Sequence, residues 1–303
     1  MITQTIGGNS HLQSSRIIMG CMRIDSLSQH DLQYLIDTAI NNGISYFDHA
    51  DIYANGYCEE HFGNSFRGNR ENIVLQTKCG IKSGVFDFSK QHIISSVENS
   101  LSRLKTSYID ILLLHRPDAL VEPEEVAEAF ETLFQQGKVL HFGVSNHNSH
   151  QLALLQKHIQ HKLLINQLQF SIMHSGIIDA GFNVNMNTEQ AIDKNGGVLD
   201  YCRLNDITIQ AWSPFTYGFF EGTFIDNERF WQLNQTLHTI STKYNVSKTA
   251  IATAWILRHP AKMQVVAGTT KPNRLQEICE GTTVTLTREE WYQIYLAAGN
   301  TLP

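Results

Sequence analysis

The stretch "SLSRLKTSYIDILLLHRPD" (residues 100–118) ends a helical pattern and begins a strand, and this change decides the fold. The helical part, 92–105, carries apolar residues at the spacing of one helix face. These residues are Ile93, Val97, Leu101 and Leu104. The apolar run that follows, 109–114, has the length of a strand and is bounded by polar residues. It predicts a buried strand that ends at His115.

The same alternation of short apolar runs and helical patterns continues along the chain. The predicted strands are Ile17–Met22, Ser45–Asp48, Ile73–Thr77, Ile109–His115, His141–Val144, Leu164–Phe170, Thr208–Trp212 and Gln264–Gly268. The clearest helical patterns are Ser28–Asn42, His92–Lys105, Glu124–Gln136 and Ser247–Arg258. Strands separated by helices indicate a parallel sheet. Eight such units in about 300 residues predict an α/β protein with a closed (β/α)8 TIM barrel.

A doubly wound open sheet is the alternative to the barrel. Its dinucleotide-binding form carries a GxGxxG motif after an early strand, and this sequence has no such motif. No break in composition marks a linker, so we expect one domain over residues 1–303. The polar, Asn-rich stretch Ser171–Gly197 predicts a long, irregular insertion over the barrel mouth.

Composition and charge exclude several classes of function. The chain is 42% hydrophobic and 17% charged with a net charge of −6, so we expect a packed soluble core and no nucleic-acid surface. The first residues lack a signal-peptide pattern, and the longest apolar run, IDILLL, is too short to span a membrane. The cysteines are scattered without zinc spacing, which predicts free thiols in the cytoplasm. They are Cys21, Cys58, Cys79, Cys202 and Cys279.

Four polar residues follow apolar runs at consecutive strand ends. Asp48 ends the second predicted strand, and Tyr53 lies in the loop beyond it. Lys78 ends the third strand and His115 ends the fourth. Any one of these residues alone is commonly a cap or a structural residue. Because the carboxyl ends of barrel strands build the active site, we expect the four side chains to meet there.

This set of residues suits proton donation. The reference pKa of tyrosine, about 10, is too high for an efficient proton donor at neutral pH, and a neighbouring ammonium lowers it. We therefore expect Lys78 to lower the pKa of Tyr53, and Asp48 to hold Lys78 in its charged form. His115 can donate a hydrogen bond that orients a substrate oxygen. Together these residues predict a proton donor for a carbonyl group that accepts a hydride.

The neighbours of Asp48 offer alternatives. Asp51 could replace Asp48 as the partner of Lys78, but we expect it to be more exposed. His49 and Asp51 could ligate a metal, but we find no third ligand and predict no metal site. A Schiff-base aldolase that uses Lys78 is a further hypothesis, although a close carboxylate would keep its amine protonated.

Six segments in order resemble the aldo-keto reductase family, and its bacterial-type branch in particular. "FDHADIYANGYCEEHFG" is similar to the strand-two signature of the family, with matches at Asp48, Ala50 and Tyr53, and Glu59 and Gly63 continue the pattern. The other segments are "SVENSLSRLKTSYIDILLLHRPD", "QGKVLHFGVSNH", "INQLQFS", "QAWSPF" and "VVAGTTKPNRLQE". The resemblance covers about 17–277. It implies a catalytic tetrad at the four residues reached above.

The resemblance also implies a nicotinamide cofactor, NADPH or less commonly NADH, bound without a Rossmann loop. It assigns the carboxamide to Ser145, Asn146 and Gln167, and one face of the ring to Trp212, where the family often has tyrosine. The other implied contacts are Gly20, Met22 and Asp48 at the mouth, Ser213, Pro214 and Phe215 at the pyrophosphate, and Gly268, Thr269, Thr270, Lys271, Arg274 and Glu277 at the 2′-phosphate end. Many members carry Pro-Lys-Ser where this chain has Ala267-Gly268-Thr269, so one phosphate-binding lysine is missing.

The sequence therefore predicts an NADP-dependent oxidoreductase that reduces aldehydes or ketones. Its partner is a small-molecule carbonyl substrate, and no nucleic acid or membrane partner is expected. The alternative from another class is an NADPH-binding regulatory subunit of a membrane channel, with little turnover. Substrate specificity is expected in the loops 81–88, 171–197 and 217–227.

Overall fold

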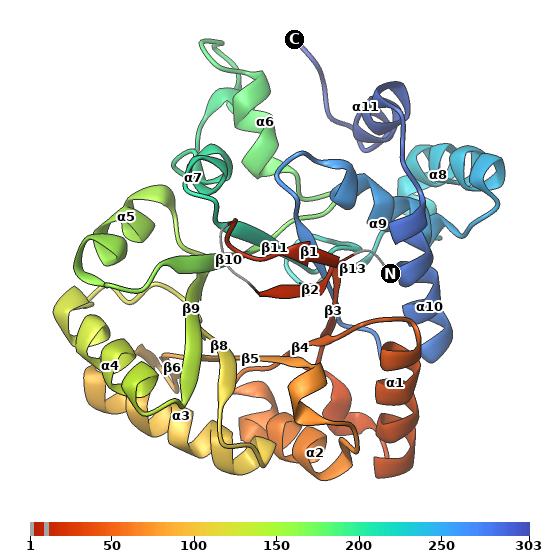
Figure 1. Cartoon of the computed structure of the whole chain (residues 1–303). Helices are drawn as coiled ribbons and strands as arrows, with labels where there is room; N and C mark the ends of the chain where they lie inside the picture. The colour runs from red at the N-terminus through yellow and green to blue at the C-terminus, as the bar shows by residue number, and fades with distance from the viewer. Residues whose placement is uncertain (1–2, 9–11) are drawn as a thin grey trace.

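The computed structural model describes residues 3–8 and 12–303, and its centre is a closed barrel of parallel strands (Figure 1). The barrel strands are β3 (Ile17–Gly20), β4 (Tyr46–Asp48), β5 (Val74–Cys79), β8 (Ile109–Leu114), β9 (Val139–Ser145), β10 (Leu163–Gln169), β11 (Thr208–Trp212) and β14 (Gln264–Ala267). Each strand pairs with the next one along the chain, and β14 closes the barrel on β3. The predicted barrel and all eight predicted strands are confirmed, with boundaries shifted by no more than two residues.

Helices surround the barrel on its outer side (Figure 1). They are α1 (Gln29–Asn41), α2 (Tyr57–Ser65), α3 (Lys90–Leu104), α4 (Pro123–Gln135), α5 (Ser149–His158), α6 (Gly176–Phe182), α7 (Val198–Leu204), α8 (Trp231–Tyr244), α9 (Lys248–Arg258), α10 (Pro272–Glu280) and α11 (Arg288–Ala297). The four predicted helices correspond to α1, α3, α4 and α9 and are confirmed. A side-chain cap begins α1, where the Ser28 hydroxyl accepts a hydrogen bond from the Asp31 backbone N–H.

Strand alternation divides the barrel side chains between two apolar clusters. Ile17 and Met19 of β3 belong to a large cluster that packs the strands against the helices, whereas Ile18 belongs to a smaller cluster inside the barrel. In β4, Phe47 belongs to the outer cluster and Tyr46 to the inner one. Successive side chains of a strand point to opposite faces, which explains the division. The barrel interior is therefore a packed core.

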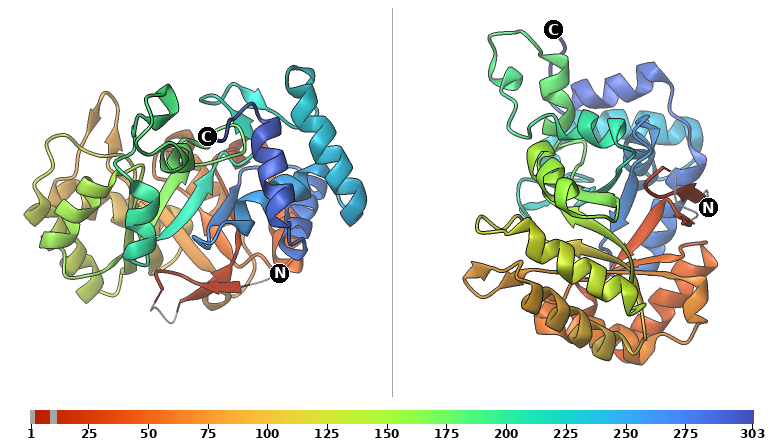
Figure 2. Two further views of the ribbon diagram at one scale, coloured as in Figure 1. Left: turned by 90° about the horizontal axis from the view of Figure 1, so that it is seen from above. Right: turned by 60° about the vertical axis from the view of Figure 1, so that its left-hand side comes forward.

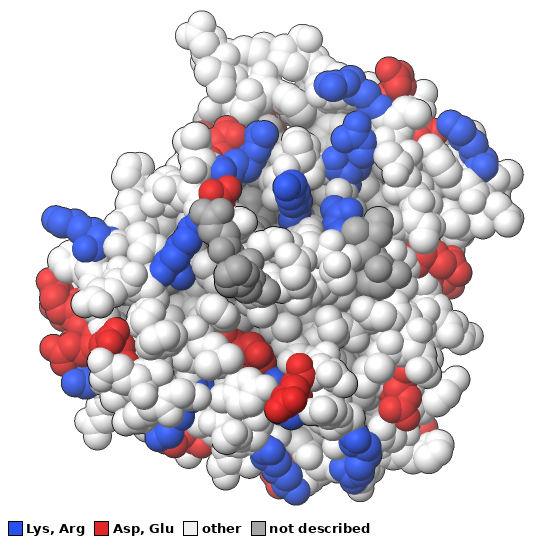
Figure 3. Space-filling view, viewed as in Figure 1, with Lys and Arg blue, Asp and Glu red and all other residues white. Residues whose placement is uncertain are grey.

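A hairpin closes one end of the barrel. β1 (Thr3–Thr5) and β2 (Gln13–Ser15) pair antiparallel and lie across the end that faces the viewer in Figure 1. Because β2 leads directly into β3, this end carries the amino ends of the barrel strands. Acidic and basic side chains are interspersed on this face (Figure 3). Short hairpins also extend two loops at the other end; they are β6 (Ile81–Lys82) with β7 (Val85–Phe86), and β12 (Thr216–Tyr217) with β13 (Gly222–Thr223).

The segment 171–197 differs from its prediction. It contains the helix α6 and protrudes from the barrel near the C-terminus (Figure 2). The Tyr295 hydroxyl of α11 donates a hydrogen bond to Asp179 at 2.8 Å, and the Phe182 ring packs edge-on against Tyr295. No residue of 171–197 lines the cavity described below. The prediction that this segment covers the barrel mouth is therefore wrong, because Asp179 and Phe182 attach it to α11 instead. Val184 and Ile192 of the segment stay exposed.

The cysteines are buried and unpaired, as predicted. Burial raises the pKa of Cys202 and of Cys279 to about 12, so these thiols stay protonated and unreactive at neutral pH. Within the described ranges, no helix has both the length and the apolar character that crossing a membrane requires.

Candidate active site

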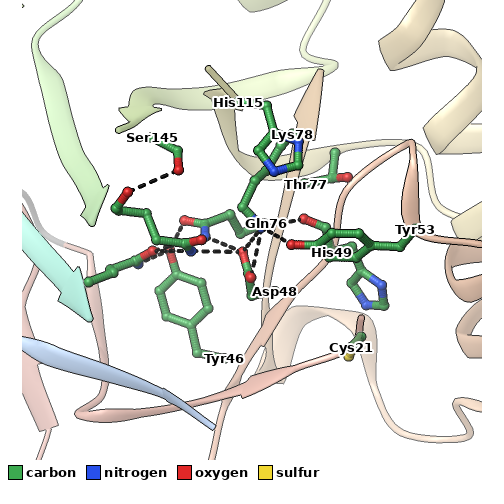
Figure 4. Close-up of polar contacts among 12 residues, drawn as sticks. Cys21, Tyr46, Asp48, His49, Tyr53, Gln76, Thr77, Lys78, His115 and Ser145 are labelled. Atoms are coloured by element: carbon green, nitrogen blue, oxygen red, sulfur yellow. Dashed lines mark hydrogen bonds and ion pairs between the residues drawn. The ribbon is translucent and has the colours of Figure 1, made fainter. Parts of the chain in front are cut away.

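Three of the four predicted catalytic residues point into the barrel from neighbouring strands. Asp48 is the last residue of β4, Lys78 is the second-last residue of β5, and His115 directly follows β8. Asp48 and Lys78 each lie two residues beyond an inward side chain, Tyr46 and Gln76, so they share its face. The carboxyl ends of these strands therefore bring the side chains together (Figure 4).

Lys78 is the centre of the hydrogen bonding at this point (Figure 4). Its ammonium donates to both carboxylate oxygens of Asp48 at 2.8 Å, to the His49 carbonyl at 2.8 Å and to the Tyr53 hydroxyl at 3.2 Å. The side chain is completely buried. Burial disfavours the ammonium, but Asp48 and Tyr53 outweigh it, so the pKa of Lys78 is raised above its ordinary value. Lys78 is therefore charged.

The Tyr53 hydroxyl accepts the hydrogen bond from Lys78, which leaves its own proton available to a group in the cavity. Burial raises the pKa of Tyr53, Lys78 lowers it and Asp48 raises it, and the result lies above the ordinary value. The prediction of a lowered pKa is wrong for this structure, because desolvation exceeds the attraction of the ammonium. The hydroxyl is therefore protonated at neutral pH, which is the form that a proton donor needs.

His115 lies against Tyr53, with the two rings edge to face and their centroids 6.0 Å apart. Burial lowers the pKa of His115 well below its ordinary value, and Lys78 and Arg116 lower it further, so its imidazole is neutral. A neutral imidazole keeps one N–H and can donate a hydrogen bond to an oxygen beside the tyrosine. His49 is enclosed instead, and burial together with Lys78 lowers its pKa to about 3.

The backbone beyond β4 turns tightly after Tyr53. The 3-10 helix η2 (Tyr53–Gly56) contains Ala54 and Asn55 with φ of 47° and 55°, and Gly56 follows with φ of 90°. The φ of Gly56 favours glycine, and a Cβ there would also lie 2.9 Å from the end of the Arg103 side chain, which would have to shift. This turn leads the chain directly into α2 and fixes the place of the tyrosine.

Glu59 of α2 anchors the turn to the barrel. Its carboxylate is fully buried, pairs with Arg103 of α3 at 2.7 Å and accepts a hydrogen bond from the Thr77 hydroxyl. Thr77 precedes Lys78 in β5. One carboxylate therefore connects two helices to the strand that carries the lysine.

Asp51 does not pair with Lys78. Its Oδ1 is buried and has no hydrogen-bond partner among the described residues, and burial together with Glu59 raises its pKa to about 7. Asp51 is also more exposed than Asp48, as predicted. The carboxylate that pairs with Lys78 is that of Asp48. In the described part of the chain, no group of three or more His, Cys, Asp and Glu side chains is arranged to hold a metal ion.

Glutamine side chains continue the network from Asp48 into the barrel interior. Gln76 and Gln167 each donate a hydrogen bond to Asp48 Oδ1 and a second one to Gln210 Oε1, the latter at 2.9 and 3.0 Å. Gln210 donates in turn to Gln264 Oε1 at 3.1 Å. All four amides are buried. The Asp48 carboxylate is therefore fixed by two amides from the barrel interior as well as by Lys78.

The remaining links of this amide network reach the hairpin at the other end of the barrel. The Tyr46 hydroxyl donates to Gln76 Oε1 at 2.6 Å and accepts from Gln210 Nε2 at 3.0 Å. Gln264 donates to the Ser14 hydroxyl at 3.0 Å and to the Ser15 carbonyl at 2.9 Å. Buried polar groups are costly unless paired, and here they pair with one another across several strands.

The sequence prediction missed this amide network, although its spacing carried a signal. Gln76 lies two residues before Lys78 in β5, and Gln210 lies two residues before Trp212 in β11. The period of two in a strand places each glutamine on the same face as a predicted site residue. The partners across the barrel follow only from the strand register, which pairs Gln167 with Gln210.

A cavity of about 700 Å³ opens at the carboxyl ends of the strands. Every predicted site residue except Lys78 lines it, and Lys78 is buried behind Asp48 and Tyr53. The cavity thus combines Asp48, Tyr53 and His115 with residues that are far apart in sequence, from 145–146, 167, 212–215 and 268–277.

The predicted nicotinamide residues form their own hydrogen-bonded group. Asn146 donates to the Ser145 hydroxyl at 2.8 Å and accepts from the Trp212 indole N–H at 3.1 Å. The amide nitrogen of Gln167 donates to Asp48 and to Gln210, which leaves its Oε1 as the atom for the predicted contact with a carboxamide. A ligand would meet its Oε1.

The other end of the cavity suits a phosphate. Lys271 and Arg274 are exposed cations at the amino end of α10, and both line the cavity. A helix amino end and a guanidinium both attract phosphate. With an amide and an indole at one end and these cations at the other, the donor set fits a nicotinamide dinucleotide phosphate.

Several cavity residues lie outside the predicted set. Arg116 directly follows His115, and Arg23 directly follows Met22, so the prediction stopped one residue short of each. Two of the expected specificity loops also line the cavity. The loop 81–88 does so with Ile81, and the loop 217–227 with Phe220, Thr223, Ile225 and Asp226. The loops could not be placed from sequence, because the shape of a loop depends on what it packs against.

Comparisons with known proteins identify the family of this chain. A model of the aldo/keto reductase family matches residues 16–297, and the chain therefore belongs to this family of oxidoreductases. The oxidoreductase YcsN of Bacillus subtilis, itself uncharacterized, is 37% identical, and the match covers 94% of this chain and 95% of that protein. A 6-dehydroglucose reductase of Agrobacterium fabrum is 32% identical over 97% of this chain and 98% of that protein.

Solved structures agree on the fold. The crystal structure of the thermostable aldo-keto reductase Tm1743, in complex with the inhibitor epalrestat, superposes with a TM-score of 0.78. The match covers 98% of this chain and 100% of that one, at 23% identity. The aldo-keto reductase MGS-M4, from a deep-sea metagenome library, gives a TM-score of 0.73 at 24% identity, with 99% of this chain and 96% of that chain covered. At such identities the agreement concerns the barrel alone.

Proposed function

We propose that this protein reduces aldehydes or ketones with NADPH. The bound cofactor supplies a hydride to the carbonyl carbon. Tyr53 gives its hydroxyl proton to the carbonyl oxygen, so that one hydride and one proton produce the alcohol. Lys78 donates a hydrogen bond to the phenolate that remains, Asp48 holds the lysine charged, and His115 donates a hydrogen bond that orients the carbonyl.

The observation that carries this proposal is the contact between Lys78 Nζ and the Tyr53 hydroxyl at 3.2 Å in a buried site. Before reaction the Tyr53 hydroxyl is neutral, so its electrostatic attraction to the Lys78 ammonium is weak. As the proton leaves, negative charge develops next to a fixed positive charge in surroundings of low dielectric constant. The lysine therefore stabilises the transition state more than the ground state, which is the requirement for catalysis.

The choice of NADPH over NADH rests on Arg274 and Lys271 at the far end of the cavity. Gly268 contributes no charge where many family members have a lysine, so the preference depends on fewer cations. Among substrates, the 6-dehydroglucose reductases of Agrobacterium fabrum and Novosphingobium aromaticivorans, 32% and 30% identical, suggest that hydroxylated aldehydes belong in the first panel.

Oxidation of NADPH by the purified protein, with small aldehydes and ketones, tests the activity. We expect Tyr53→Phe to lower kcat by about 10²- to 10⁴-fold, the usual contribution of a general acid, without weakening NADPH binding. Tyr57→Phe is the matched control, because this exposed tyrosine lies in the same segment, stacks on His61 and does not line the cavity. Full turnover by Tyr53→Phe would reject the proton-donor assignment. Tight NADPH binding without turnover of any carbonyl would favour the regulatory-subunit alternative.

A further inference from the structure

Arg116 is a half-buried cation in the candidate active site, and no carboxylate of the described residues pairs with it. It directly follows His115 and lines the cavity. Within residues 3–8 and 12–303, its guanidinium makes no ion pair and no hydrogen bond. Its guanidinium carbon lies 6.0 Å from the centroid of the Trp212 ring. Such a distant ring compensates little of the cost of burying a charge.

Two other partly buried arginines of this chain have carboxylate partners. Arg70 pairs with Asp110 at 2.6 Å, and Arg103 pairs with Glu59 at 2.7 Å. Each also donates further hydrogen bonds to the protein. A guanidinium keeps its charge in every protein environment, so its burial calls for an acceptor. Arg116 differs from these arginines in facing a cavity that can hold a ligand.

The charges around this end of the cavity leave Arg116 uncompensated. The acidic residues that line the cavity are Asp48, Asp226 and Glu277, and within the described residues none of them forms an ion pair with Arg116. The Asp48 carboxylate is already shared by Lys78 and two glutamines, and Asp226 pairs with Lys248. Arg23 lines the same cavity, is exposed and has no ion pair within the described residues. The lining of the cavity also has an apolar part, and Trp212 of this part lies beside Arg116. It includes Met22, Ile52, Ile81, Trp212 and Phe220. An anion with an apolar body complements both features.

We propose that Arg116 binds the carboxylate of the substrate, and that the substrates of this protein are oxo acids, in which one molecule carries an aldehyde or ketone and a carboxylate on an apolar body. This inference rests on the proposed reductase function and specifies its substrate class. The sequence adjacency of His115 and Arg116 supports it, because a carbonyl held at His115 and Tyr53 has a second anchor close by. The planar guanidinium can hold a carboxylate through two parallel hydrogen bonds, which lysine cannot do.

Two aldehydes that differ in charge test this inference. 4-Formylbenzoate and methyl 4-formylbenzoate share the ring and the reacting group, and only the first is an anion. We expect the wild type to favour 4-formylbenzoate by about tenfold or more in kcat/KM. Arg116→Gln should lower kcat/KM for the acid by about 10- to 100-fold, the range for a lost charge-assisted pair, and leave the ester within about threefold. For Arg116→Lys, we expect a kcat/KM for the acid between those of the wild type and Arg116→Gln.

Arg67→Gln is the matched control for net charge. This exposed arginine lies outside the cavity, so its removal lowers the net charge by the same amount without removing a cation from the site. We expect a change of no more than about threefold for the acid, and one that disappears at high salt. An equal loss in Arg67→Gln and Arg116→Gln would overturn the assignment to Arg116, because it would mean general attraction only.

The outcomes separate this inference from the proposed function. Reduction of the ester by all variants, without any preference for the acid, keeps the reductase and overturns the oxo-acid inference. A raised KM for NADPH in Arg116→Gln, with an unchanged ratio of acid to ester, would assign the arginine to the cofactor and also overturn it. If neither aldehyde is reduced, the oxo-acid inference is tested by calorimetry, which measures the binding of terephthalate to the protein in the presence of NADP⁺. Binding that Arg116→Gln abolishes supports the inference, and absence of binding to the wild type rejects it.

Discussion

The two ends of the cavity are built in opposite ways. At the catalytic end, Lys78 and Asp48 are 0% and 2% exposed and hold one another through two hydrogen bonds of 2.8 Å. At the far end, Lys271 and Arg274 are exposed, and within the described ranges neither is paired with a carboxylate. One end is complete before any ligand binds, whereas the other presents cations to solvent.

This contrast shows that a buried cation needs a carboxylate of the protein, whereas an exposed cation does not. A buried ammonium without a partner would lose its proton or destabilise the fold, so its carboxylate must be part of the protein. Exposed cations are hydrated and need no protein partner, so they remain available to a phosphate. Changes at the buried end should therefore affect stability and catalysis together, and changes at the exposed end should affect only cofactor binding.

Lys78→Met should have the largest effect on both stability and turnover. It leaves Asp48 buried without its cation, for which we expect a loss of about 3–5 kcal/mol in the free energy of unfolding. Turnover should fall by at least about 10³-fold, because the phenolate loses its stabilising charge. Urea unfolding and NADPH oxidation measure the two effects.

Two further variants sharpen this result. Lys138→Met removes a surface lysine that pairs with the exposed Glu98, and it should change the free energy of unfolding by less than about 1 kcal/mol. The double variant Lys78→Met with Asp48→Leu removes the unpaired carboxylate, so it should be more stable than Lys78→Met but equally inactive. A double variant no more stable than the single one would contradict the uncompensated charge as the cause.

Gln210→Met should have an intermediate effect. It keeps the volume but removes the amide that joins Gln76, Gln167 and Gln264, and the buried partners lose hydrogen bonds. We expect a loss of about 2 kcal/mol or more in the free energy of unfolding. We also expect a fall of about tenfold in kcat, with little change in the KM for NADPH, because Asp48 is held less firmly.

The control for this glutamine is Gln135→Met, which removes an exposed amide on α4 that bonds only Glu131. Its stability and kinetics should match those of the wild type. A fall in stability without any fall in kcat for Gln210→Met would show that the amide network supports the barrel but not the position of Asp48.

Arg274→Gln should have the smallest effect and should leave stability unchanged. We expect the KM for NADPH to rise by about five- to tenfold, since a charge-assisted contact is lost from an exposed site. The KM for NADH, which lacks the 2′-phosphate, should stay within about twofold. Arg67→Gln is the control, because Arg67 is exposed and lies outside the cavity. Equal effects on both cofactors would contradict the phosphate role.

The sequence could bring together the polar residues of the candidate site because three of them lie at or next to the carboxyl ends of strands. A buried strand reads as an apolar run, and the polar residue that ends it stands out, as Asp48 and His115 do. The amide network could not be predicted in the same way, since none of its four glutamines stands at the carboxyl end of a strand and their partners depend on the strand register. Arg116 was missed for another reason, because an arginine on a loop is ordinary until its surroundings show that it lacks a partner.

The order of strands and helices, the barrel and the residues at the strand ends could all be read from one sequence, because periodicity and chain direction act locally along the chain. Other properties became apparent only in the folded chain. They are the side chains that touch across the barrel, the raised pKa of Tyr53, the packing of 171–197 against α11, and the unpaired position of Arg116 at the cavity. These properties depend on distance and desolvation between segments far apart in sequence, and only folding brings those segments together.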